Sequence, residues 1–129
     1  FRRVLFRSLG MQSISPSRMI NLSDATPGAN SGIVMFGTTT TATIDYFLKR
    51  ESTGAYRKGK IQIIKVNSNI DYYDEYMEYP DATNLVYPGP TGITFTVNPE
   101  SSNRMILNYT ATGGATANLT YSITTTSIV

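Results

Sequence analysis

The sequence predicts an all-β domain, an antiparallel β-sandwich or jelly-roll of about seven to eight strands. Several short segments alternate apolar and polar residues, most clearly residues 93–97 and 119–123, and this period of two gives a strand one apolar face. Turn-forming glycine, proline and asparagine residues separate these segments at spacings of about 8 to 12 residues, as in sandwich folds. No stretch of about ten residues or more carries a helical period.

Residues 1–31 are expected to precede the sandwich. The first eight, FRRVLFRS, resemble a translated sequencing adapter of the kind that contaminates metagenomic reading frames, so we expect residues 1–10 to be artefactual or disordered. A genuine N-terminal strand or basic arm is the alternative. Residues 11–31 are rich in serine, asparagine, proline and glycine, which predicts an extended lead-in with at most one short strand, at residues 19–22.

The expected sandwich domain covers residues 32–129, and its first strands surround a threonine tract. Glycines bound the apolar run at residues 32–37, and Ile44, Tyr46 and Leu48 then follow with the alternation of a strand. The threonines between them favour extended backbone because β-branched side chains fit a pleated surface. We therefore predict two neighbouring strands or a hairpin here.

A central strand is predicted at residues 61–66. Its alternation places Ile61 and Ile63 toward the core. Ile64 and Val66 indicate partial burial on the second face as well, which is typical of a strand inside a sheet.

The last third of the chain begins with a predicted long loop. Residues 80–90 contain three prolines and a glycine, which interrupt a ladder because proline has no amide hydrogen to donate. Three further strands are predicted at residues 92–97, 104–111 and 117–125, joined by connectors with ordinary turn residues.

The composition lacks the residue types that enzymes use most often for catalysis. The chain has no histidine and no cysteine, so it lacks the commonest general base and the commonest strong nucleophile. It also has no glycine-rich phosphate loop, dinucleotide fingerprint or metal-ligand spacing. We therefore predict a protein that is not an enzyme and holds no cofactor or metal.

Charge and hydropathy argue against nucleic acid and membranes as partners. The formal charge is +2, but three of the eleven basic residues, Arg2, Arg3 and Arg7, lie in the adapter-like segment. Without them the nine acidic residues outnumber the basic ones by one. Apolar runs fall far short of the ~20 residues of a membrane helix. We predict neither nucleic-acid binding nor membrane insertion.

Many of the remaining basic residues gather around one predicted hairpin. They are Lys49, Arg50, Arg57, Lys58, Lys60 and Lys65. The pattern is typical of a charged loop that flanks a strand, because lysine and arginine are mostly exposed. A weak electrostatic role in subunit contact is the alternative.

An acidic and aromatic cluster is the main candidate for function. Residues 71–81 contain five carboxylates and four tyrosines. A tyrosine ring can stack on a sugar or an aliphatic surface while its hydroxyl forms a hydrogen bond, and neighbouring carboxylates can accept hydrogen bonds from sugar hydroxyls. The predicted ligand- or receptor-binding residues are Tyr72, Asp74, Glu75, Tyr76, Glu78, Tyr79 and Asp81.

The same cluster is compatible with three alternatives to ligand binding. Tyr73 and Tyr76 can pack inward while the acidic residues line a solvated strand face. A calcium site is disfavoured because the spacing does not match an EF-hand loop. A glycosidase pair such as Asp74 and Glu78 depends on a separation in space that the sequence does not give.

Six segments follow one another in an order that is more informative than any one of them. They are Ile44-Asp45-Tyr46, RKGKIQI at residues 57–63, Asp74-Glu75-Tyr76, TGITF at 91–95, LNYTAT at 107–112 and ANLTYSI at 117–123. This succession resembles a C-terminal β-sandwich domain of tail fibres, tail spikes and related virion structural proteins of tailed phages. The resemblance covers about two-thirds of the chain.

The resemblance implies an extracellular-facing part of a virion that forms a homotrimer and serves host attachment or fibre-tip assembly. Its receptor would be a glycan or a protein of the host surface, contacted by the tyrosine- and aspartate-rich segment. Two alternatives remain: a carbohydrate-binding module of a larger secreted enzyme or adhesin, and a phage head-decoration or capsid-fibre protein. Oligomeric state separates the first alternative from the fibre hypothesis, because appended binding modules are usually monomers.

Overall fold

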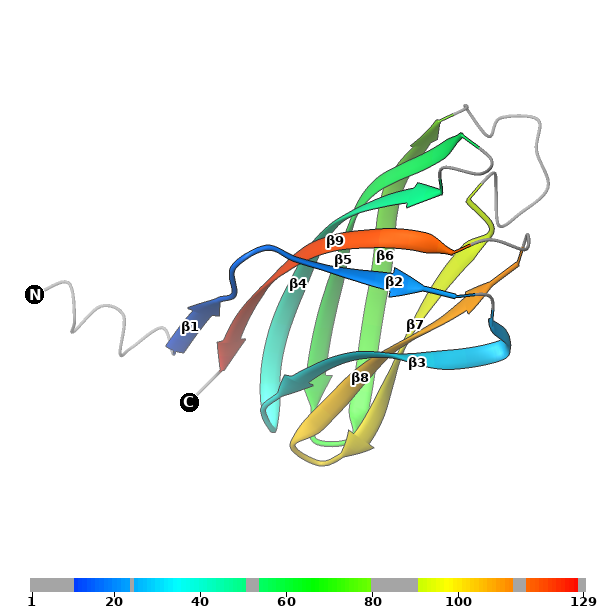
Figure 1. Ribbon diagram of the computed structural model, residues 1–129. Coiled ribbons are helices and arrows are strands. Elements are labelled where there is room, and N and C mark those ends of the chain that lie inside the picture. The colour runs from blue at the N-terminus through cyan, green and yellow to red at the C-terminus, as the bar shows by residue number, and fades with distance from the viewer. Residues whose placement is uncertain (1–10, 24, 51–53, 80–90, 113–115, 128–129) are drawn as a thin grey trace, which may run out of the picture.

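The computed structural model describes residues 11–23, 25–50, 54–79, 91–112 and 116–127, which form two antiparallel β-sheets packed face to face (Figure 1). The predicted all-β sandwich is therefore confirmed. The described residues form nine strands, slightly more than expected: β1 (Met11–Ile14), β2 (Arg18–Leu22), β3 (Ala25–Phe36), β4 (Thr39–Arg50), β5 (Ala55–Val66), β6 (Asn69–Tyr79), β7 (Ile93–Ser101), β8 (Arg104–Ala111) and β9 (Ala117–Ser127).

The larger sheet has the order β1-β9-β4-β5-β6, and β2 also pairs with β9. The smaller sheet has the order β3-β8-β7. In the larger sheet Ile44 pairs with Ile61 on one side and with Ile123 on the other, which fixes the register of its centre. β6 and β7 are the last strands of their sheets in this order, and they lie on the same side of the sandwich (Figure 1).

The core lies between the two sheets and follows the alternation of the strands. β4 buries every second residue from Thr40 to Arg50, and Ile61 and Ile63 of β5 are buried as predicted. The small sheet contributes buried side chains such as Phe95, whose ring meets the Tyr46 ring edge-on at 5.2 Å between centroids. Ile64 and Val66, on the opposite face of β5, are about half exposed.

The segment expected as a lead-in contributes more strand than predicted. β1 and β2 lie end to end along β9, and Ser15 between them continues the pairing by donating its amide to the Ile123 carbonyl at 2.8 Å. β3 also begins at Ala25 and not at the apolar run. Edge pairing uses backbone groups, so a segment rich in turn residues can still complete a sheet when a long strand such as β9 offers a free edge.

The described loops also differ from expectation at β7. This strand continues to Ser101, through a segment predicted as a turn, and it includes Pro99. Proline is tolerated here because β7 is the edge of its sheet, so the amide groups on one side of the strand donate to no neighbouring strand of that sheet. The long loop predicted at residues 80–90, and the segment 1–10, lie outside the described residues. No helix in the described ranges is long and apolar enough to cross a lipid bilayer.

Three of the cations expected in a charged loop are instead fully buried. Arg50, Arg57 and Lys65 are each about 1% exposed or less. They occupy core-facing positions of β4 and β5, so the interpretation as a solvated loop is wrong for these three. Lys58 and Lys60, on the other face of β5, are exposed as expected.

Two of these cations, Arg50 and Lys65, form hydrogen bonds to backbone carbonyl groups near the ends of strands. Arg50 donates from Nη1 to the Thr91 carbonyl at 2.8 Å and also to the Thr112 carbonyl. Lys65 donates to the carbonyls of Asn67 and Ser102. Both cations thus satisfy carbonyl groups at strand ends, which lowers the cost of burying them.

Candidate functional site

The residues predicted to bind a ligand lie on β6, where they divide between two faces. Tyr72, Asp74, Tyr76 and Glu78 are in register with Ile63, Ile61, Gly59 and Arg57 of β5 and therefore face the small sheet. Glu75 and Tyr79 face outward, and Asp81 lies outside the described residues. β6 thus brings four of the seven candidates together and separates two from them.

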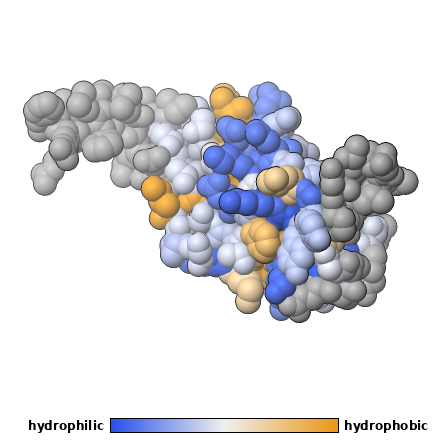
Figure 2. Space-filling model, turned by 90° about the horizontal axis from the view of Figure 1, so that it is seen from above, coloured by the Kyte–Doolittle hydropathy of each residue, from blue (hydrophilic) through white to orange (hydrophobic). Residues whose placement is uncertain are grey.

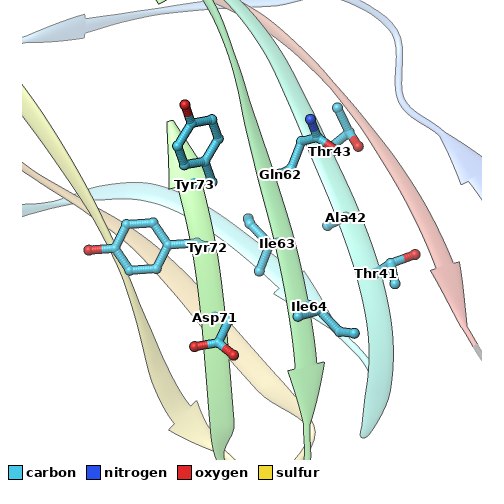
Figure 3. Close-up of a pocket in the computed structure, with 9 residues that line it drawn as sticks. All are labelled: Thr41, Ala42, Thr43, Gln62, Ile63, Ile64, Asp71, Tyr72 and Tyr73. Atoms are coloured by element: carbon cyan, nitrogen blue, oxygen red, sulfur yellow. The ribbon is translucent and has the colours of Figure 1, made fainter. Parts of the chain in front are cut away.

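The alternative that Tyr73 and Tyr76 both pack inward is wrong for Tyr73. Residues three apart in a regular strand point to opposite faces, and Tyr73 is 63% exposed on the outside. Figure 3 shows the Tyr72 ring extending from β6 on the side away from β5, while the ring of its neighbour Tyr73 takes another direction.

A buried ion pair forms the base of the inward face. Nη2 and Nε of Arg57 lie 3.0 and 3.1 Å from Oε2 of Glu78, and both side chains are nearly inaccessible to solvent. The Thr91 hydroxyl donates to the same carboxylate oxygen at 2.5 Å. The Arg57 guanidinium also lies 4.0 Å from the centre of the Tyr76 ring. One cation therefore fixes both the carboxylate and the aromatic ring.

Asp74 and Tyr46 form a second polar pair on this face. The Tyr46 hydroxyl donates to Oδ1 of Asp74 at 2.7 Å. Burial, reinforced by the Asp74 charge, raises the pKa of Tyr46 far above its ordinary value, so the phenol stays a donor. Burial also raises the pKa of Asp74, against the opposing effects of the Tyr46 hydrogen bond and the Arg57 charge. Nothing in the sequence pattern joins Tyr46 to this cluster.

We expect Asp74→Asn to be more stable than the parent protein at neutral pH. Because folding raises the pKa of Asp74, the folded parent protein holds this proton more tightly than the unfolded chain does. The stability that protonated Asp74 contributes is complete below the unfolded pKa, and it is lost as the pH rises through the raised folded pKa. Asparagine never ionises and still accepts from Tyr46. Urea unfolding at pH 7 and at acid pH measures the difference in unfolding free energy between Asp74→Asn and the parent protein. This difference should shrink as the pH falls toward about 4, where Asp74 becomes protonated. A difference that grows in acid would contradict the assignment.

The inward face of β6 opens into a cleft between the edges of the two sheets. Its volume is about 360 Å³, and the residues that line it are Arg57, Tyr72, Asp74, Tyr76, Ile93, Thr94, Phe95 and Thr96. Tyr72 and Tyr76 are 40% and 37% exposed, whereas Ile93 and Phe95 are buried. The cleft therefore has an apolar floor and half-exposed aromatic and polar walls.

The outward face of β4, β5 and β6 carries a row of aromatic rings. The Phe47 and Tyr56 rings lie 6.0 Å apart, and the Tyr56 and Tyr79 rings 6.4 Å apart, measured between centroids. Tyr73 and Met77 project from the same face of β6 and are strongly exposed. We call these five residues the outer aromatic face. Exposed apolar clusters of this kind often mark contact surfaces.

A shallow hollow of about 480 Å³ adjoins the outer aromatic face (Figure 3). Thr41, Thr43, Gln62 and Tyr73 are among the residues around it. Seen from above in Figure 2, apolar residues form separate patches among hydrophilic ones. The face of the molecule in that view is therefore mixed in character.

No metal centre is assembled by the residues that the structure describes. They contain no group of three or more histidine, cysteine, aspartate or glutamate side chains that could hold a metal ion. Asp74 and Glu78 share a face of β6, but Glu78 is held by Arg57 and Thr91.

No protein-family model matches this chain, and neither does any curated protein. Among solved structures, the tailspike protein of Acinetobacter phage vB_ApiP_P1 is similar, with 9% sequence identity and a TM-score of 0.36. The similarity covers 91% of this chain and 22% of the tailspike, so the chain spans about a fifth of that protein's length.

Proposed function

We propose that this chain is a non-enzymatic virion structural module of the phage tail fibre or tail spike type. It serves host attachment or fibre-tip trimerisation on the virion exterior, through surface contacts. The observation that supports this function most is the outer aromatic face, where Tyr73, Met77 and Tyr79 are between 63% and 71% exposed. Large exposed apolar side chains on one sheet face are costly in water and mark a surface that another molecule covers.

The charges on the same face support a second copy of the chain as the partner. Asp45, Lys60 and Glu75 lie in register on β4, β5 and β6, so negative, positive and negative groups follow one another across the sheet. Lys60 lies 3.8 Å from Asp45. A face that carries both signs beside apolar rings can complement a neighbouring copy, which closed symmetry then repeats.

We expect the 129-residue chain to have the mass of a trimer in solution, measured by size-exclusion chromatography with light scattering at several concentrations. Met77→Glu should shift the mass toward the monomer, because it places a charge in the apolar contact. Phe36→Glu is the matched control, since Phe36 is 65% exposed on β3, which belongs to the smaller sheet. A monomer at every concentration would overturn trimerisation, and equal dissociation by both variants would overturn the outer aromatic face as the contact.

The second candidate function is a carbohydrate-binding module of a larger secreted enzyme or adhesin. The row of Phe47, Tyr56 and Tyr79 favours it, because several rings across one sheet face can stack on successive sugar units. A persistent monomer that binds an oligosaccharide through these rings would favour this function over the fibre module.

A further inference from the structure

The cleft between β6 and β7 has the build of a small-molecule site, independent of the outer aromatic face. It lies where the two sheets are not joined by a ladder, and its volume of about 360 Å³ falls within the range of ligand pockets. Tyr72 and Tyr76 stand on β6 two residues to either side of Asp74, and Thr94 and Thr96 line the opposite edge.

The polar groups of the cleft are already positioned. Tyr46 holds Asp74 through Oδ1 at 2.7 Å, and because a carboxylate has about four acceptor positions, others remain for a ligand. Arg57 supports the Tyr76 ring from 4.0 Å. Groups that are fixed before binding lose little conformational freedom when a ligand enters.

We propose that this cleft binds one ring of a neutral saccharide. The faces of Tyr72 and Tyr76 contact the C–H surface of the sugar, while Asp74 accepts hydrogen bonds from its hydroxyl groups. β7 is the edge of its sheet, and the backbone groups of this edge can both donate and accept, as sugar hydroxyls require. The site is available to a fibre module and to an appended binding module alike, so it goes beyond the proposed function.

The charges in the cleft select a neutral sugar over an acidic one. The single cation, among the described lining residues, is Arg57, and it is engaged by Glu78 at 3.0 Å. Asp74 adds a negative charge beside the sugar position. An acidic sugar would therefore lie beside the Asp74 carboxylate, while the charge of Arg57 is already balanced by Glu78. Both features disfavour the binding of an acidic sugar.

The test is a titration of the ¹⁵N-labelled 129-residue chain, followed by amide NMR. The probes are the methyl glycosides of glucose, galactose, mannose and N-acetylglucosamine, with glucuronate as the acidic comparison. We expect at least one neutral glycoside to shift the amides of residues 72–76 and 94–96, with a millimolar Kd, and glucuronate to bind about tenfold less well or not at all. Shifts confined to other strands, or no shift with any neutral glycoside, would overturn the proposal.

Tyr72 and Tyr73 offer a matched pair of variants, because they are neighbours on one strand and face opposite sides. Tyr72→Ala should weaken neutral-glycoside binding about tenfold, the usual value of one aromatic contact, and Tyr73→Ala should leave it unchanged. Tyr72→Phe keeps the ring and should bind as the parent does, which separates lost stacking from a disturbed fold. Equal losses in Tyr72→Ala and Tyr73→Ala would overturn the placement in the cleft.

Failure of this titration leaves the proposed trimer unaffected, because the two tests address different faces of β6. Asp74→Asn supplies a second readout. It removes the negative charge while it retains an acceptor, so the preference for neutral glycosides over glucuronate should fall. An unchanged preference would overturn the role of Asp74.

Discussion

Glu78→Gln is expected to destabilise the protein by about 3 to 5 kcal/mol, because it leaves the buried Arg57 charge without its counter-charge. Both side chains of this pair are almost completely buried. Glutamine keeps an acceptor for the Thr91 hydroxyl, so the loss reports mainly the missing charge. Urea unfolding monitored by tyrosine fluorescence measures the change, since the chain contains no tryptophan.

Glu75→Gln is the matched control for this prediction. Glu75 is also on β6 but faces outward beside Lys60, where solvent screens the interaction. Its stability change should stay within about 0.5 kcal/mol. A loss of less than about 1 kcal/mol in Glu78→Gln would contradict a desolvated ion pair.

The double variant Arg57→Met with Glu78→Leu tests the same pair from the other side. Apolar residues of similar length remove both charges together, so we expect most of the stability lost in Glu78→Gln to return. Recovery would show that the ion pair itself adds little net stability, because the cost of desolvating both charges offsets their attraction. No recovery would mean that Arg57 stabilises the fold through its other contacts, such as the Tyr76 ring.

The alternation of residues is sufficient to predict the sandwich and its central strands. Ile61 and Ile63 are buried as the pattern predicts. The same period places Arg57 and Lys65 on the core side, but the usual exposure of charged residues favours the opposite interpretation. The burial of these cations depends on carbonyl and carboxylate partners that come from distant segments, such as Ser102 and Glu78.

The sequence predicts which segment carries the candidate site, but it does not predict that the residues of this segment divide between two faces of the sheet. Composition alone singles out residues 71–81, and parity separates Tyr72 from Tyr73 once a strand is assumed. The contribution of Tyr46 and of β7 cannot be predicted, because both depend on how the sheets meet. Short edge strands such as β1 escape prediction for a related reason, since backbone pairing leaves little trace in side-chain pattern.

Gly59→Ala is expected to destabilise the protein by about 1 to 3 kcal/mol, the usual cost of overpacking a core. Gly59 lies in β5 between Tyr46 and Tyr76, in register with both. An added Cβ would lie 2.6 Å from the Tyr46 ring and 2.8 Å from the Tyr76 Cβ, closer than real contacts allow. The Tyr46 ring would have to move, and this would weaken both its contact with Phe95 and its hydrogen bond to Asp74.

Gly28→Ala is the control for this substitution, because its added Cβ would meet the Tyr109 carbonyl at an ordinary 3.5 Å. Alanine otherwise stabilises a strand relative to glycine, by about 0.5 to 1 kcal/mol, so the two variants should change the unfolding free energy in opposite directions. Near-ultraviolet circular dichroism of the tyrosines should also change in Gly59→Ala alone. If Gly59→Ala proved as stable as Gly28→Ala, the close packing of Tyr46 over β5 would be contradicted, and with it the position of Asp74 in the cleft.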